Sequence, residues 1–361
     1  MNIIPAKYEI IDIPSPNDKM AVLKHIEKIA RTCYKSEDRI TDTSCIKMIE
    51  NLKNRKHWAM LEHYVFVMRV SHEVADSIIE IINDIKKYDV DLDAYNSFKF
   101  LNVTTNYTNP YGEYQNIVSV SATTINYLTE FIDRYDEVDY LNGLGLLRRF
   151  LYNHYPELIN KPIDLIITDT QKDQLNEYLS SDFKFIDSKD LSNIEYAQYE
   201  HRLIHEYMTV KFTVDRGVSH EIVRHRMASY AQESTRYCNY SKDGFGGEIT
   251  VIVPNFFRPN TTEYDCWKRT CKMAEHEYFE LLRLGATPQQ ARSVLPNSLK
   301  TEIIMTANLQ EWIHFFKMRV PMSAHPQMRE VTIPLFKQLI NDKPEIFERH
   351  KYFLEENEVI K

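Results

Sequence analysis

Glycine is scarce in this chain of 361 residues, which holds eight, about 2% against the roughly 7% usual in proteins. The two glycine clusters, at 143–145 and 244–247, complete neither G-x-G-x-x-G nor G-x-x-x-x-G-K-[ST]. The sequence therefore excludes a Rossmann or P-loop cradle for a nucleotide.

Cysteine and long apolar runs are also limited. The five cysteines are odd in number and form no C-x-x-C pair, which argues against a disulfide framework and a structural zinc site. His220 and His225 are five residues apart rather than four, so they do not complete H-E-x-x-H, and no metal site is expected. No run of about 18 apolar residues occurs, and no basic segment precedes an apolar stretch after Met1. We therefore expect a cytoplasmic protein with no membrane partner.

Charge is unevenly distributed around a net value of −8. Between His72 and His205 there are 23 acidic and 11 basic residues, whereas the rest of the chain has 33 basic and 29 acidic residues. We interpret the acidic segment 72–205 chiefly as solvated surface, and we expect an anionic ligand to bind to the more basic remainder of the chain. Nothing in this balance indicates a nucleic-acid binder.

Hydrophobic periodicity predicts an α+β fold, a mixed or antiparallel sheet flanked by helices. Strands are expected at His63–Val70, Tyr207–Asp215 and Glu248–Val253. Helices are expected at Val22–Cys33 with Asp18 as cap, Ser44–Lys53, Asn126–Tyr135, Leu141–His154 and Glu263–Leu284, the last of which stops at Gly285. The first two strands are expected to be neighbours in one sheet. About 130 residues separate them, too many for a plain loop, so 72–205 is predicted to be an inserted subdomain in which Val103–Tyr111 is turn material.

Helix caps mark the C-terminal third of the chain. Thr287-Pro288-Gln289-Gln290 has a capping-box pattern, which predicts the start of a helix. Asn308 to Glu311 has the same kind of helix-start pattern. Aromatic residues at helical spacing follow, namely Trp312, Phe315 and Phe316. We expect these side chains and that of Tyr278 to lie in the hydrophobic core.

The segment 224–237 concentrates polar chemistry, with three arginines, a histidine and several hydroxyl groups. On an extended chain Arg224 and Arg226 point to one side and can converge on one anion, whereas on a helix they diverge. Arginine suits bidentate phosphate recognition. The competing interpretation of R-H-R alone is an exposed, salt-bridged helix start.

The longer pattern resembles the signature of the flavin-dependent thymidylate synthases, R-H-R-x-x-S-x-x-[QE]-x-S-x-R-Y. It is met at Arg224, His225, Arg226, Ser229, Gln232, Ser234, Arg236 and Tyr237. Flanking segments are also similar to that family, namely 30–34, 57–63, 291–296, 308–319 and 324–327. The resemblance covers roughly residues 1–71 and 206–345, which implies a synthase core at 1–71 and 206–361.

This resemblance implies reductive methylation of dUMP to dTMP without a cysteine nucleophile. Methylenetetrahydrofolate would supply the carbon, and NADPH would supply the hydride through FAD. It also implies a homotetramer with shared active sites.

The resemblance assigns roles by position. The residues implied for dUMP are Arg224, Gln232, Ser234, Arg236, Arg292 and Arg319. Arg319 is also the implied catalytic residue, because it would stabilise negative charge developing on the uracil ring. The residues implied for FAD are His57, Glu62, His225, Arg226, Asn308 and His314.

Four positions depart from the family pattern: Ala59, Glu221, Gln310 and His314. Glu221 stands where some members have a glutamine facing dUMP. A carboxylate beside a nucleotide requires a cation or a proton.

A second function class stays open, a non-catalytic nucleotide or nucleic-acid binding protein that uses the cluster of Arg224, Arg226 and Arg236. The presence of His57, Arg292 and Arg319 far along the chain favours the enzyme, because binding a phosphate alone would not require all of them.

Overall fold

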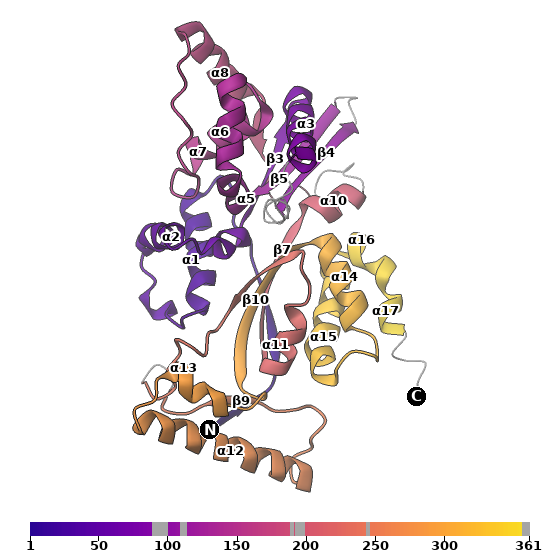
Figure 1. Cartoon of the computed structure of the whole chain (residues 1–361). Helices are drawn as coiled ribbons and strands as arrows, with labels where there is room; N and C mark the ends of the chain where they lie inside the picture. Colours follow the sequence, from indigo (N-terminus) through magenta and orange to yellow (C-terminus); the bar gives the residue numbers. More distant parts are fainter. Residues whose placement is uncertain (89–99, 109–113, 188–190, 192–198, 243–245, 356–361) are drawn as a thin grey trace. The chain divides into compact units, whose positions relative to one another are not determined.

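The computed structural model describes residues 1–88, 100–108, 114–187, 191, 199–242 and 246–355 (Figure 1). The chain divides into two compact units. Unit 1 comprises Met1–Ile11, Ile29–Asp38 and Thr209–Lys361, and unit 2 comprises Asp12–Lys28 and Arg39–Met208. Within the described residues, no helix is long and apolar enough to cross a membrane.

Unit 1 is built on a four-stranded sheet with the order β2-β7-β10-β8. The strands of unit 1 are β1 (Asn2–Ile4), β2 (Lys7–Ile11), β7 (Tyr207–Asp215), β8 (Ala228–Gln232), β9 (Thr250–Ile252) and β10 (Lys300–Asn308). Its helices are α11 (Arg216–Ile222), α12 (Thr262–Arg283), α13 (Pro288–Ala291), α14 (Leu309–Arg319), α15 (Pro326–Asp342), α16 (Pro344–Phe347) and α17 (Tyr352–Glu355). Helix α1 (Lys19–Thr32) begins in unit 2 and ends in unit 1. The expected α+β class is confirmed.

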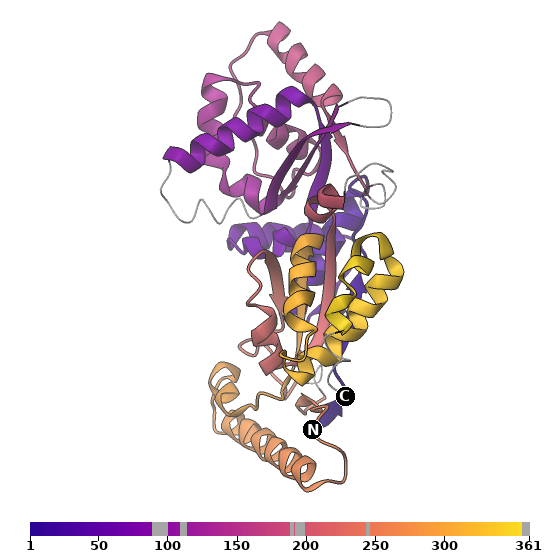
Figure 2. The same cartoon turned by 90° about the vertical axis from the view of Figure 1, so that its right-hand side faces the viewer.

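The core of unit 1 lies between this sheet and helices α14 and α15, which run beside it in both views (Figures 1 and 2). Phe212 of β7 lies 6.3 Å from the ring of Trp312 and 6.0 Å from that of Phe315. Phe316 continues the cluster toward Phe336, at 4.8 Å. All five side chains are fully buried, so the predicted aromatic core of α14 is confirmed.

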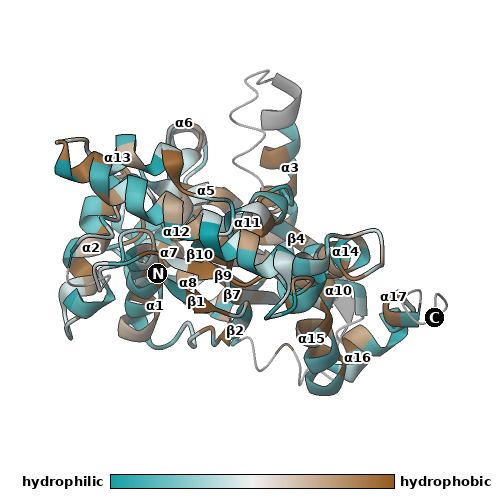
Figure 3. Ribbon diagram, turned by 90° about the horizontal axis from the view of Figure 1, so that it is seen from below, coloured by the Kyte–Doolittle hydropathy of each residue, from teal (hydrophilic) through white to brown (hydrophobic). Residues whose placement is uncertain are grey.

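A smaller layer of unit 1 pairs β1 with β9 in parallel, and α12 belongs to the same apolar cluster. Helix α12 carries hydrophilic and hydrophobic positions along its length (Figure 3), and it buries Cys271 and Tyr278. It ends before Gly285, whose φ of +94° suits a residue without a Cβ. The predicted helix 263–284 and its glycine stop are confirmed.

Glu302 of β10 is the centre of a partly buried charge network. Its carboxylate lies 2.5 Å from Nζ of Lys35, 3.4 Å from that of Lys300 and 3.7 Å from that of Lys211. Burial alone would raise the pKa of this carboxyl, but the three ammonium groups outweigh it and lower the pKa to about 2. The network therefore makes unit 1 sensitive to acid.

Unit 2 contains a second four-stranded sheet, β4-β5-β3-β6, in which all neighbours are antiparallel. Its strands are β3 (Val65–Val70), β4 (Leu101–Thr108), β5 (Tyr114–Ser121) and β6 (Phe183–Phe185). Its helices are α2 (Ser44–Asn54), α3 (His72–Tyr88), α5 (Ala122–Tyr127), α6 (Thr129–Val138), α7 (Gly143–His154), α8 (Asp169–Ser181) and α10 (Tyr199–His205).

The expectation that the strands at 63–70 and 207–215 are neighbours is wrong. Strand β3 pairs with β5 and β6, whereas β7 pairs with β2 in the other sheet. The reason is that the expected insert supplies strands of its own, which occupy both edges of β3. The insert also supplies β4, at 101–108, which pairs with β5. The expected turn material at 103–111 is therefore a strand over its described part, and the β-branched side chains of Val103 and Thr104 suit that conformation.

The compact units also differ from the expected division into 1–71 with 206–361 and 72–205. Residues 12–28 and 39–71 group with the insert. Unit 2 has its own buried polar core, where Asp136 accepts hydrogen bonds from Arg149 at 2.6 Å and from Asn142 at 2.6 Å. Gly145 lies against this carboxylate, and a Cβ at that position would overlap Asp136. Unit 2 is therefore a packed unit with its own core.

Candidate functional site

The R-H-R segment lies in the turn between α11 and β8, all within unit 1. Residues 224–227 are neither helical nor part of a strand, so neither of the two conformations weighed from the sequence applies. Arg224 and Arg226 are exposed, and no ion pair or side-chain hydrogen bond involves them within the described chain. His225 between them is buried. The turn thus separates two free cations from one buried imidazole.

Arg319, at the end of α14, is bound by the residues just before this turn. Its Nη1 donates to Oε2 of Glu221 at 2.7 Å, and its Nη2 donates to the main-chain oxygen of Glu221 at 2.9 Å. Its Nε donates to Nε2 of His225 at 3.1 Å. Three of the five guanidinium N–H bonds are used in this way, which leaves two for a ligand. The cation that Glu221 was expected to require is Arg319.

The electrostatic setting of Arg319 is nearly balanced. Burial lowers the pKa of its guanidinium, Glu221 opposes that shift and Arg224 adds to it. Arginine stays charged through such shifts. The side chains of Arg319 and Glu221 are 15% and 27% exposed, so solvent reaches the pair only partly.

His225 has its tautomer defined by its partners. Its Nε2 accepts from Arg319, so the ring proton is on Nδ1, which donates to Oε1 of Glu311 at 3.2 Å. His314 lies beside it, with the two rings 5.5 Å apart. The donor atoms of His225, Glu311 and His314 lie within 4.8 Å of one another, as metal ligands do. The guanidinium on the other ring nitrogen adds a positive charge there, which disfavours a cation.

A cavity of about 480 Å³ lies in unit 1 beside α11 and α13. Two arginines and a histidine line it, and no acidic residue does. Its polar lining residues are Arg216, His220, Thr235, Gln289, Arg292, Ser293 and Asn297. Of these residues, Arg292 alone was predicted from the sequence to bind the nucleotide. Arg216 was missed although it directly follows a buried strand, where polar residues often mark a site.

The motif residues after β8 approach this cavity. Arg292 Nη1 donates to the hydroxyl oxygen of Thr235 at 3.3 Å, and Arg236 Nε donates to the amide oxygen of Gln289 at 3.2 Å. Thr235 and Gln289 both line the cavity. Ser234 Oγ accepts from the main-chain nitrogen of Arg236 at 3.3 Å. The structure thereby connects Arg236 and Arg292, which the family resemblance assigned to one ligand, with residues that line this cavity.

Gln232 is bound within the protein. Its amide nitrogen donates to Ser219 at 2.9 Å and to Thr301 at 3.3 Å. Asn308 acts as the N-cap of α14, since its side chain accepts from the main-chain nitrogen of Glu311 at 3.0 Å. Both residues have a local structural role in addition to the roles implied for them.

His57 and Glu62 belong to unit 2, where they lie just before and within a short 3₁₀-helix, Trp58–His63. The remaining implied site residues belong to unit 1. His57 is exposed and Glu62 is half-buried.

Cys238, next to the motif, is a buried thiol. Burial raises its pKa to about 12, so it is a poor nucleophile.

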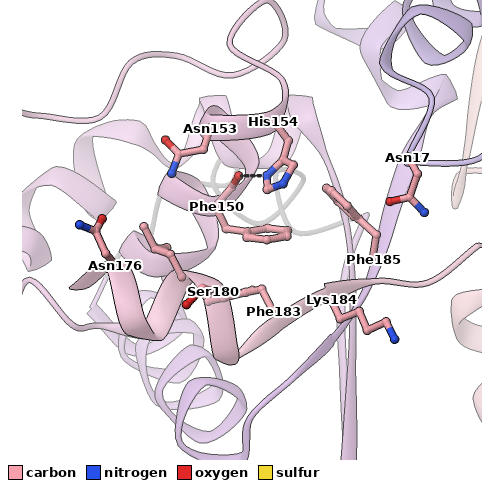
Figure 4. A pocket seen from close by; sticks show the side chains of 10 residues that line it. Asn17, Phe150, Asn153, His154, Asn176, Ser180, Phe183, Lys184 and Phe185 are labelled. Atoms are coloured by element: carbon pink, nitrogen blue, oxygen red, sulfur yellow. Dashed lines mark hydrogen bonds between the residues drawn. The ribbon is translucent and has the colours of Figure 1, made fainter. Parts of the chain in front are cut away.

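Unit 2 has a cavity of different character, of about 500 Å³ (Figure 4). Phe150, Phe183 and Phe185 gather around His154, whose Nδ1 is hydrogen-bonded to the main-chain oxygen of Phe150. Asparagines and Lys184 complete the lining, and no arginine is present. The arginine-lined cavity of unit 1 is the better anion site of the two.

Comparison with known proteins agrees with the motif. The model of the family described as thymidylate synthase complementing protein matches residues 169–345, so the match begins inside the expected insert. A flavin-dependent thymidylate synthase from Pyrococcus furiosus is 29% identical over 184 residues, which cover 50% of this chain and 75% of the relative. One from Geobacter sulfurreducens is 31% identical over 150 residues, which cover 41% of this chain and 63% of the relative.

Among solved structures, a UMP/dUMP methylase from Streptomyces cacaoi, bound with 5-Br UMP, aligns with a TM-score of 0.36 and 20% identity. The alignment covers 46% of this chain and 82% of that one.

Proposed function

We propose that the chain is a member of the flavin-dependent thymidylate synthase family and converts dUMP to dTMP by reductive methylation. Methylenetetrahydrofolate is the proposed carbon donor, and NADPH is the proposed reductant, acting through FAD. The observation that carries the proposal is the cavity of unit 1, which Arg292 lines and Arg236 approaches while no acidic side chain faces it.

The two ends of dUMP require different environments, and consecutive residues of α11 provide them. His220 lines the arginine-rich cavity, whereas Glu221 binds Arg319. The uncompensated cavity suits the phosphate dianion. Arg319, balanced by Glu221, suits the uncharged uracil ring, to which its two remaining N–H bonds can donate.

Arg319 is the proposed catalytic residue. Methylation at the uracil ring builds negative charge on it, and a fixed guanidinium stabilises such charge without reorganisation at the moment of reaction. His225 and Glu221 are positioning residues, because they hold the guanidinium through three hydrogen bonds. Cys238 takes no part, since its thiol is buried and its pKa is raised.

The residues present fit a flavin dinucleotide. Arg226 and His314 are exposed, and the guanidinium of Arg226 pairs with no acidic residue in the described chain, as a site for a pyrophosphate requires. These two residues, with His57, Glu62, His225 and Asn308, are the proposed FAD contacts. Bound FAD would supply the hydride chemistry that no side chain here can supply. We also propose the homotetramer that the family resemblance implies, which light scattering tests, and a cytoplasmic location.

The test is anaerobic incubation of the purified protein with FAD, NADPH, dUMP and methylenetetrahydrofolate, with dTMP detected by mass spectrometry. Arg319→Lys should lower the rate by about 100-fold or more, because removing one such donor typically costs that much. Arg283→Gln, on the exposed face of α12, is the matched control and should keep full activity.

Two results would contradict the proposal. A protein that binds FAD and dUMP but forms no dTMP refutes the reaction. A colourless protein that refuses added FAD and still binds dUMP supports the non-catalytic nucleotide-binding alternative.

A further inference from the structure

Arg216 faces the same cavity as Arg292 but lies outside the sequence motif. It is the first residue of α11, directly after β7, and its main-chain nitrogen donates to the oxygen of Asn297 at 2.9 Å. Both flanking elements are packed, since the whole of β7 apart from Lys211 is buried. The position of Arg216 is therefore fixed by the fold.

The guanidinium of Arg216 is held by one nitrogen only. Its Nη1 donates to the main-chain oxygen of Glu233 at 3.3 Å and to the hydroxyl of Thr301 at 3.4 Å. No hydrogen bond from its Nε or Nη2 is found within the described residues. The nearby carboxylate of Glu233 is taken by Lys300 at 2.7 Å. Arg216 is thus oriented by neutral acceptors, and its charge is not balanced by an ion pair in the part of the chain that the structure describes.

Two such arginines beside one cavity are costly without a ligand. Burial lowers the pKa of Arg216, Tyr240 and Glu233 act against this shift, and the like charge of Arg292 adds to it. A dianion between the two groups would remove this repulsion and would accept from their free N–H bonds. The guanidinium fork matches the oxygen spacing of a phosphate.

We propose that Arg216 binds the phosphate monoester of dUMP together with Arg292, as the second arginine of this cavity. The inference rests on the proposed function for the identity of the nucleotide. It adds a specificity-determining residue, because a ligand without the phosphate gains nothing from Arg216.

The experiment measures binding to the FAD-loaded protein by calorimetry, with dUMP, deoxyuridine and inorganic phosphate as separate ligands. Arg216→Gln should weaken dUMP and phosphate roughly 10- to 100-fold, the range for losing a charge-assisted hydrogen bond. The affinity for deoxyuridine should stay unchanged. Arg283→Gln is the matched control and should bind all three ligands as the unmodified protein does.

If Arg216→Gln does not fold, a second measurement on the unmodified protein tests the inference. Phenylglyoxal labels accessible arginines, and peptide mapping should show that dUMP protects Arg216 whereas deoxyuridine does not.

Three outcomes overturn the inference: unchanged dUMP affinity in Arg216→Gln, equal weakening of dUMP and deoxyuridine, or labelling of Arg216 that dUMP does not slow. Failure of the proposed function looks different. A protein that binds dUMP through Arg216 and makes no dTMP refutes the reaction and supports the site.

Discussion

Replacing Glu221 by glutamine should strengthen dUMP binding, because Glu221 is the counter-ion of Arg319, the arginine proposed to bind the uracil ring. The replacement removes the charge and keeps the shape. Arg319 should stay in place, since the main-chain oxygen of residue 221 and Nε2 of His225 still accept from it at 2.9 and 3.1 Å. The new amide oxygen can also accept from Nη1.

The magnitude follows from the separation of the charges. The Nη1–Oε2 distance of 2.7 Å places the two charge centres about 4 Å apart, which corresponds to about 4 kcal/mol at an effective dielectric constant of about 20. Solvent screens this pair, because its side chains are 15% and 27% exposed. The uracil ring carries no net charge, so only the strengthening of its hydrogen bonds by an unpaired guanidinium is recovered. That is about 1 kcal/mol, so Glu221→Gln should bind dUMP roughly 5-fold more tightly.

The assay is titration of the FAD-loaded protein with dUMP at constant ionic strength. Glu280→Gln is the matched control, since Glu280 pairs with the exposed Arg283 of α12 and not with Arg319. Its dUMP affinity should not change. Weaker or equal binding by Glu221→Gln would refute the reasoning, because it would show that the carboxylate does not compete with the nucleotide for Arg319.

Three further predictions concern the scaffold. Phe316→Ala should destabilise unit 1 by about 3–5 kcal/mol in urea unfolding, because the ring is fully buried, whereas exposed Met318→Ala should change the free energy of unfolding little. The carboxyl of Glu302 has a folded pKa of about 2 against 4.5 for the free group, so its stabilising contribution is present above about pH 4.5 and is lost as the pH falls toward 2. Glu302→Gln should therefore lose less stability over that interval in acid unfolding, and an unchanged pH profile would contradict this. Gly145→Ala should destabilise unit 2 by about 2 kcal/mol or more, because the new methyl group overlaps buried Asp136, and wild-type protection of α7 in hydrogen exchange would contradict it.

The sequence predicted elements whose signals are local. Asp18 accepts from the main-chain nitrogen of Ala21 at 3.0 Å at the start of α1, and Thr287 forms its predicted capping box. Asn308 caps α14, and α12 stops at Gly285 as expected. Each of these depends on a few neighbouring residues, so one stretch of sequence contains the whole cause.

The pairing partner of each strand could not be predicted from local sequence in the same way. The alternation of apolar and polar residues correctly predicted strands near 65–70 and 207–215. This alternation does not depend on which strand is the neighbour, so it cannot identify the partner. The structure places them in different sheets, because β5 and β6 pair with β3. Choice of partner depends on which edges are free in the folded chain, and this is a long-range property.

The candidate site shows the same division. The spacing of Arg224, Ser234 and Arg236 by itself indicated a family and a kind of ligand, because this motif lies within one short stretch of the sequence. Only the tertiary structure joined Arg319 to Glu221, 98 residues away, and brought Arg216 beside Arg292. Contacts of this kind form when α11 and α14 pack against the sheet that contains β7. The charges around each arginine, which decide what it can bind, are brought together only by that packing.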